Sequence, residues 1–291
     1  MKDAADRAAA ALLRLVIGGI QALPVAAVRR LGTAAGEMTR RLDRRHPRVA
    51  LRNLESAFPD VPPADHRALV RRCFRRQGSL MFDNIRVAKL PPTELCRRLE
   101  LVGWEHFRQA EEAGRGVLVI SGHLGVHELI VHAVPVYKGP VDVVARATGK
   151  SRVDAVLGGL RQRHGNRLIA KRGAVWGMLE SLRRGGRVAI LPDQRVHPNE
   201  GIEVPFFGRS SFTSPFPARV SQRTGAPALP IFAYQAPGGR YRLEARPPIF
   251  PGGPGDGETR RLSAAYLAVI EDEIRRQPEE WLWMHERWRR H

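Results

Sequence analysis

The chain has 291 residues and a formal net charge of +19, because 48 Lys and Arg outnumber 29 Asp and Glu. This length allows a large buried core in one or two domains, and two cysteines, Cys73 and Cys96, are too few for a disulfide framework or a cysteine-rich zinc site. The excess of positive charge favours an anionic partner, which can be nucleic acid, an anionic membrane surface or an acidic protein.

Residues 8–28 form a mostly apolar segment that a cluster of arginines follows at once. Arg14 would cost about 2.5–3.5 kcal/mol at the centre of a spanning helix, and Pro24 interrupts the apolar run. The arginines that follow are Arg29, Arg30, Arg40, Arg41, Arg44 and Arg45. This combination predicts a helix that lies in a membrane interface with its basic residues on lipid headgroups, and it leaves a single span or an ordinary soluble helix as alternatives.

The first 110 residues are predicted to be mostly helical. Two further helices are expected at 49–58 and 64–87, and the proline pairs at 62–63 and 91–92 separate the segments.

From residue 111 onward, apolar strands alternate with helices, which predicts an α/β fold with a mostly parallel or mixed central sheet and helices on its faces. Strands are expected at 117–120, 141–144, 188–191 and 229–234, with 241–245 as an edge strand. Helices are expected at 151–164, 174–184, 215–224 and 258–276. We therefore expect an α/β unit over residues 111–291 that is integrated with the helical portion over residues 1–110.

The segment 116–128 is the strongest candidate for chemistry. A buried strand ends there at Ser121-Gly122, His123 follows, and Glu128 stands five positions later in the first turn of a helix expected from about residue 125. In this arrangement His123 would accept a proton from a hydroxyl while Glu128 holds the imidazole and offsets its new charge. The alternative is structural, because an acidic residue is favoured at a helix start and a histidine can be a packing residue.

A second pair, His106 and Glu111, has the same spacing but lies within a polar amphipathic helix over 104–113. Residues five apart on one helix diverge by roughly 140°. The pair therefore cannot readily cooperate.

Ligands of open α/β sheets gather beyond the carboxyl ends of the strands. Other polar or flexible features expected there are Arg146 after 141–144, Asp193 and Gln194 after 188–191, and the loop 201–215 with Phe207 and Gly208. Each also has a structural interpretation, as a surface arginine, a turn-capping aspartate or core phenylalanines. Near the carboxyl terminus, Trp281, Trp283 and Trp288 could meet a membrane interface or pack on the sheet.

Together these motifs resemble the bacterial lipid A biosynthesis lauroyl/myristoyl acyltransferase family, within the wider lysophospholipid acyltransferases marked by His-x4-Asp/Glu. The resemblance covers nearly the whole chain, with matching segments in family order at 53–59, 122–128, 145–146, 186–194, 204–208, 212–215, 225–230 and 281–285.

The resemblance implies that His123 is the general base that deprotonates an acceptor hydroxyl, with Glu128 orienting it. The activated oxygen would attack the thioester of an acyl chain on acyl carrier protein, the co-substrate, without a metal or other cofactor. The positions assigned to substrate binding are Arg146, Asp193, Gln194, Phe207 and Gly208. His127 stands where the family often has another residue and is a competing, weaker candidate for the base.

The expected partners are acyl carrier protein, anionic membrane lipids and a glycolipid acceptor, and the expected location is the cytoplasmic face of the inner membrane. A lipid A precursor is the leading acceptor, with a phosphatidylinositol mannoside or a lysophospholipid as the alternative. A basic nucleic-acid-binding protein would share the charge, but the chain carries no zinc-finger or RNA-recognition signature, so no nucleic acid is expected.

Overall fold

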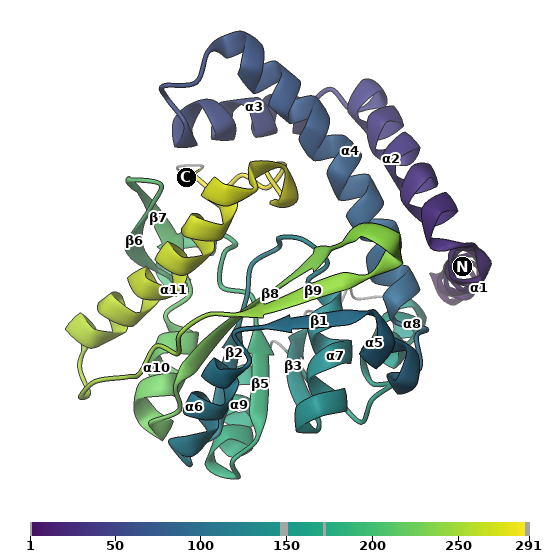
Figure 1. Cartoon of the computed structure of the whole chain (residues 1–291). Helices are drawn as coiled ribbons and strands as arrows, with labels where there is room; N and C mark the ends of the chain where they lie inside the picture. The colour runs from purple at the N-terminus through teal and green to yellow at the C-terminus, as the bar shows by residue number, and fades with distance from the viewer. Residues whose placement is uncertain (1, 146–150, 171–172, 289–291) are drawn as a thin grey trace.

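A seven-stranded sheet with helices on both faces forms the centre of the computed structural model, which describes residues 2–145, 151–170 and 173–288 (Figure 1). In spatial order its strands are β1 (Leu99–Val102), β9 (Tyr241–Ala245), β8 (Ala228–Gln235), β2 (Val117–Ile120), β5 (Arg187–Ile190), β3 (Val141–Ala145) and β4 (Arg167–Ala170). Every neighbouring pair is parallel except β8 with β9. The predicted α/β class with a mostly parallel sheet is confirmed.

Two layers of helices bury the faces of this sheet. One hydrophobic cluster contains residues of α5 (Pro92–Arg98), α6 (Glu105–Glu112), α7 (Glu128–Lys138) and the end of α4 (Pro63–Val87). The other contains residues of α9 (Ala174–Arg183), α10 (Phe216–Thr224) and α11 (Asp256–Arg276). Strand β2 supplies Val117 and Val119 to the first cluster and Leu118 and Ile120 to the second. Because both of its faces are buried, β2 is an uninterrupted apolar run.

Helices of the amino-terminal portion arch above the sheet in Figure 1, and α8 lies lower, beside the amino terminus. The amino-terminal helices are α1 (Lys2–Ala22), α2 (Val25–Leu42), α3 (His46–Ala57) and α4 (Pro63–Val87), and α8 spans Ser151–Arg161. The apolar segment 8–28 is not one helix, because the chain breaks at Leu23-Pro24 and α2 then continues to Leu42, through four of the predicted arginines. Among the described residues, no helix is both long and apolar enough to span a membrane.

Helices α2 and α4 cross at very close range through glycines. A Cβ on Gly78 of α4 would lie 2.1 Å from the carbonyl oxygen of Gly32, and a Cβ on Gly36 of α2 would lie 2.1 Å from that of Phe74. These atoms belong to backbone, so a side chain at Gly36 or Gly78 would push the helices apart. The glycines thus fix the spacing of two helices that line a cavity described below.

Several short strands were not predicted. Strand β1 takes the edge position expected for β9, and β4 forms the opposite edge. The segment 201–215, expected to be a loop, contains the antiparallel hairpin of β6 (Ile202–Phe206) and β7 (Arg209–Thr213). Short half-exposed edge strands carry little apolar alternation, and the glycine, serine and proline content of 201–215 resembles that of a loop.

The described part of the chain also contains three single-turn 3-10 helices, at Pro198–Glu200, Pro237–Gly239 and Pro278–Glu280. The last of these is followed directly by Trp281 and Trp283, and Trp281 contacts the site described below.

Candidate active site

The loop after β2 carries His123 past the carboxyl edge of the sheet, and two glycines define its path. A Cβ on Gly122 would lie 3.3 Å from Asp193 Oδ2, so a larger residue would crowd that carboxylate. Gly125 has a φ of +60°, and a Cβ there would lie 2.1 Å from the carbonyl oxygen of Ala233. Helix α7 therefore begins only after this turn, three residues later than predicted.

His123 is held by Asp193. The ring Nδ1 lies 2.8 Å from Asp193 Oδ1, and the backbone N–H of His123 donates to Asp193 Oδ2 over 2.7 Å. The indole Nε1 of Trp281 donates to the same Oδ2 over 2.8 Å. Asp193 is 1% exposed, and these donors satisfy its buried charge. When Nδ1 carries the proton and donates it in a hydrogen bond to the carboxylate, Nε2 of the neutral ring carries the lone pair that can accept a proton.

These residues meet because β2 and β5 are parallel neighbours, with Ile120 opposite Ile190 at their carboxyl ends. The carboxyl-terminal segment joins them, since the backbone N–H of Leu282 donates to the carbonyl of His123 over 3.2 Å. Three stretches far apart in the sequence thus build one site.

The pKa shifts of His123 and Asp193 reflect this pairing. Burial disfavours the charged imidazole, but the charge of Asp193 and its hydrogen bond outweigh burial and raise the pKa of His123. Burial also disfavours the Asp193 carboxylate, but the charge and hydrogen bonds of His123, with the bond from Trp281, hold its pKa well below the usual range. The pair therefore stabilises an imidazolium, which is what a general base becomes after it takes a proton.

Glu128 was predicted to hold the imidazole of His123, but its carboxylate is hydrogen-bonded to Arg161 instead. Arg161 Nε donates to its Oε2 over 2.9 Å, and the Arg161 Nη2 contacts its Oε1. Although burial opposes ionisation, this guanidinium lowers the pKa of Glu128 to about 2. The hydrogen bond to Nδ1 of His123 therefore comes from Asp193 and not from Glu128, whose carboxylate is turned to α8. The charge of Glu128 still helps to raise the pKa of His123, so the expected offsetting of charge is compatible with this geometry.

Two cavities meet at His123. One, of about 560 Å³, extends along the sheet, and the other, of about 620 Å³, lies among α2, α4, α7 and α8. Both are within the usual size range of small-molecule sites. The side chains that line both are His123, His127, Glu128 and Arg161.

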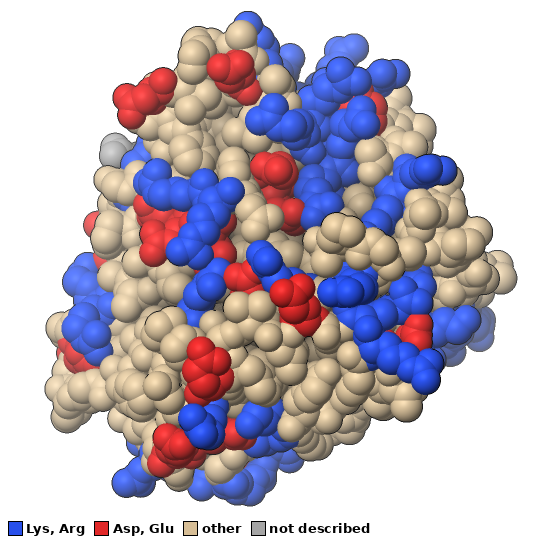
Figure 2. All heavy atoms as spheres, in the orientation of Figure 1, with Lys and Arg blue, Asp and Glu red and all other residues tan. Residues whose placement is uncertain are grey.

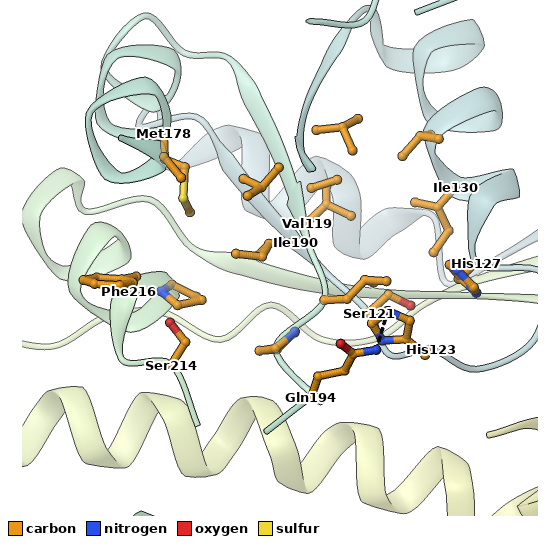
Figure 3. A pocket seen from close by; sticks show the side chains of 18 of the residues that line it. Val119, Ser121, His123, His127, Ile130, Met178, Ile190, Gln194, Ser214 and Phe216 are labelled. Atoms are coloured by element: carbon orange, nitrogen blue, oxygen red, sulfur yellow. Dashed lines mark hydrogen bonds between the residues drawn. The ribbon is translucent and has the colours of Figure 1, made fainter. Parts of the chain in front are cut away.

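The first cavity has a polar end at His123 and a mostly apolar remainder, where Ser214 is an exception beside Phe216 (Figure 3). Ser121, His123 and Gln194 gather at the polar end, and Met178 lies at the far side. Gln194 Nε2 is 3.2 Å from His123 Nε2, so the predicted substrate-binding residue Gln194 does face the cavity next to the base. Asp193 is not among the residues that line either cavity, so its placement supports positioning of His123 rather than contact with substrate.

His127 also reaches both cavities, and its ring centroid lies 5.4 Å from that of His123. Burial lowers the pKa of His127, and its Nδ1 has no hydrogen-bond partner among the described residues. His123 is therefore the stronger candidate for the base.

Phe207 and Gly208, predicted to bind substrate, line neither cavity. They form the turn of the β6–β7 hairpin, where Phe207 adopts a φ of +54° and packs against Phe58 and Trp283. Phe207 is thus a core residue, which corrects the assignment. Arg146 lies outside the described residues.

Packing also decides between the interpretations of Trp281, Trp283 and the His106–Glu111 pair. Trp281 and Trp283 are buried, so they pack in the core rather than at a surface, and Trp281 reaches the site. In the second His–Glu pair, Glu111 bonds Lys138 and Arg187 rather than His106. Over residues 2–145, 151–170 and 173–288, no group of three or more His, Cys, Asp or Glu side chains is arranged to hold a metal ion.

A carboxylate-held histidine between two cavities can deprotonate a hydroxyl in one cavity for attack on an acyl group in the other. Such an arrangement suits acyl transfer, and comparison with known proteins identifies the class of the protein as an acyltransferase. The family model described as bacterial lipid A biosynthesis acyltransferase matches residues 5–290, and the chain belongs to this family.

Individual relatives support the same assignment. The chain is 27% identical over 272 residues to the lipid A biosynthesis lauroyltransferase of Escherichia coli K12, which covers 92% of this chain and 87% of that protein. It is 27% identical to the palmitoleoyltransferase of the same organism, over 89% of this chain and 84% of the relative. The E. coli myristoyltransferase is 25% identical, over 88% and 77% of the two chains.

The buried carboxylate predicts the pH dependence of catalysis. Replacing Asp193 with Asn removes the charge that raises the pKa of His123 and leaves burial, which lowers it. The acid limb of kcat/KM, which rises as His123 loses its proton, should therefore move to lower pH, and the maximal rate should fall about 10²- to 10⁴-fold because the ring is no longer oriented.

The measurement is kcat/KM from about pH 5 to pH 9 for both proteins. Asp142→Asn is a matched control, because Asp142 is also buried but pairs with Arg167. An acid limb that stays in place in Asp193→Asn would show that another group sets it.

Proposed function

We propose that the protein transfers a fatty acyl chain from acyl carrier protein to a hydroxyl of a lipid A precursor at a membrane surface. The observation that carries this proposal is the His123–Asp193 pair at the meeting point of two cavities. One base facing two cavities suits a reaction in which a hydroxyl of an acceptor in one cavity attacks the acyl group of a donor in the other.

The two cavities differ in a way that suggests which substrate each holds. The cavity along the sheet is walled by Val119, Val143 and Met178 and ends at Ser121 and His123. We assign the donor's acyl chain to it, with the thioester at the polar end. The cavity among the helices is lined by Ala35 and Thr39 of α2 and by Met81 of α4, and we assign the acceptor lipid to it.

Exposed apolar side chains on α1 and α2 support docking on a bilayer. On α2, Leu31, Met38 and Leu42 are exposed on the same helical face as Ala35, which lines the cavity. On α1, Leu12, Leu15 and Val16 are exposed, and Leu15 retains 74% of its accessible surface. Contiguous exposed apolar side chains of this kind are typical of membrane and partner surfaces.

Basic side chains accompany this surface. Figure 2 shows Lys and Arg gathered over the region where Figure 1 has α2 and α4, and the exposed arginines of α4 include Arg67, Arg71, Arg72 and Arg75. Such charge attracts anionic headgroups and would also speed association with an acidic carrier protein.

The identity of the acyl chain is left open by the relatives. Three proteins of nearly equal identity to this chain are named for lauroyl, palmitoleoyl and myristoyl transfer. We therefore propose the reaction and the acceptor class without a chain length.

Removal of the base tests the reaction. Purified protein given an acyl carrier protein thioester and a lipid A precursor in mixed micelles should yield a product heavier by one acyl group in mass spectrometry. His123→Ala should lower the rate at least about 10³-fold, because general base catalysis and orientation are both lost.

The matched control is His106→Ala, which removes a half-buried histidine of α6 that lines neither cavity and should leave turnover unchanged. Near-normal turnover by His123→Ala would refute the base assignment. Transfer to a phosphatidylinositol mannoside or a lysophospholipid, but not to the lipid A precursor, would refute the proposed acceptor.

Membrane docking makes a separate prediction. Leu12→Glu with Leu15→Glu should weaken binding to phosphatidylglycerol vesicles at least about 10-fold, because each buried leucine contributes about 1.5–3 kcal/mol. Sedimentation with vesicles at low and high salt measures the binding, and high salt should also weaken vesicle binding by the wild-type protein.

Phe250→Glu is the control, since Phe250 is exposed in the segment between β9 and α11, away from α1 (Figure 1). If the α1 variant and the Phe250 variant bind vesicles equally well, α1 is not part of the docking surface.

A further inference from the structure

Ser121 is the last residue before the glycine that precedes the base, and its hydroxyl is unused by the fold. The side chain is 2% exposed, and its Oγ has no hydrogen-bond partner among the described residues. An unpaired buried hydroxyl costs free energy of about 1–3 kcal/mol. A group that weakens the folded state in this way calls for a reason for its presence.

The position of Ser121 is fixed by the sheet. Its backbone N–H donates to the carbonyl of Ile190 over 3.3 Å, which extends the β2–β5 pairing by one residue. Side chains alternate along a strand, so Ser121 continues the face of Val117 and Val119. Both Val119 and Ser121 line the cavity assigned to the acyl chain, and Ser121 stands at its polar end beside His123 (Figure 3).

We propose that the Ser121 hydroxyl is a catalytic hydrogen-bond donor to the carbonyl oxygen of the acyl thioester, and that it stabilises the oxyanion formed during transfer. This inference rests on the proposed function. When the acyl chain lies against the apolar wall that includes Val119, the thioester must lie at the polar end of the cavity. Ser121 and His123, two residues apart in the sequence, are both at this end. The missing hydrogen bond of the free protein is then made by the substrate.

Protons and electron pairs balance in this transfer. His123 Nε2 takes the proton of the acceptor hydroxyl, and the hydroxyl oxygen forms a bond to the thioester carbon while the carbonyl electron pair moves onto oxygen. Ser121 O–H donates to that oxyanion without losing its proton. When the carbonyl re-forms, the carbon–sulfur bond breaks, and the leaving thiolate takes the proton from His123. The products are an ester and a free thiol.

Other buried serines provide matched comparisons. Ser263 on α11 is buried with an unpaired Oγ among the described residues but lines neither cavity, and Ser221 on α10 is buried with its Oγ donating to the carbonyl of Ala226 over 2.6 Å. If the Ser121 hydroxyl only stabilised the fold, its removal should have the same effect as removal of the Ser221 hydroxyl. If it had no role, its removal should have the same effect as removal of the Ser263 hydroxyl.

The test is a set of variants assayed as purified full-length protein for kcat, KM for the thioester donor, and the midpoint of thermal unfolding. Ser121→Ala should lower kcat about 10²-fold, as loss of one oxyanion donor does elsewhere, with KM little changed. Its unfolding midpoint should equal or exceed that of the wild type, because no bond is lost. Ser121→Thr, which keeps a hydroxyl, should recover at least a tenth of the wild-type kcat.

Ser263→Ala should keep both activity and midpoint, and Ser221→Ala should lower the midpoint. The acid limb of kcat/KM should stay in place in Ser121→Ala, because the His123–Asp193 pair is intact.

Full activity of Ser121→Ala while His123→Ala is inactive would overturn this inference and leave the proposed function standing. A parallel loss of activity and midpoint, or a change in KM alone, would also overturn it by showing a structural or a simple binding role. Full activity of His123→Ala would overturn the proposed function and this inference together.

Discussion

The buried contact between His123 and Asp193 is the interaction on which the rest of the site depends. A carboxylate that is 1% exposed can remain charged only if donors surround it. Here the donors are the His123 ring, the His123 backbone and the Trp281 indole. Each comes from a segment that must itself be held in place, so the end of β2, the end of β5 and the carboxyl-terminal segment are mutually dependent. The same charge makes His123 a stronger base.

Much of this architecture could be predicted from sequence. The uninterrupted apolar run of β2 and the glycine turn after it mark a buried strand ending in a loop, and the alternation beyond it indicates the α/β class. The proline pairs, which were expected to separate the helical segments, lie at the starts of α4 and α5. Short edge strands such as β1 and β4 were not predicted because half-exposed segments of four residues carry little periodic signal.

The partner of His123 could not be found in the same way. The spacing from His123 to Glu128 is local and visible, whereas Asp193 lies 70 residues further along the chain. Their contact follows from β5 lying beside β2, and strand order is not encoded in the periodicity of either strand. The role of Trp281 was missed for the same reason. Glu128 instead starts α7 and pairs with Arg161 of α8, which places that ion pair between the two cavities and gives it a part in shaping them.

The most direct test of the central interaction is the protonation of the His123 ring, measured by ¹⁵N NMR of the histidine-labelled protein at a pH above its raised pKa. The neutral ring should carry its proton on Nδ1, with Nε2 unprotonated, in the wild type and in Glu128→Gln, and this preference should be lost in Asp193→Ala. A ring protonated on Nε2 in the wild type, or a preference that survives in Asp193→Ala and disappears in Glu128→Gln, would contradict the assignment of Asp193 as the residue that orients the base.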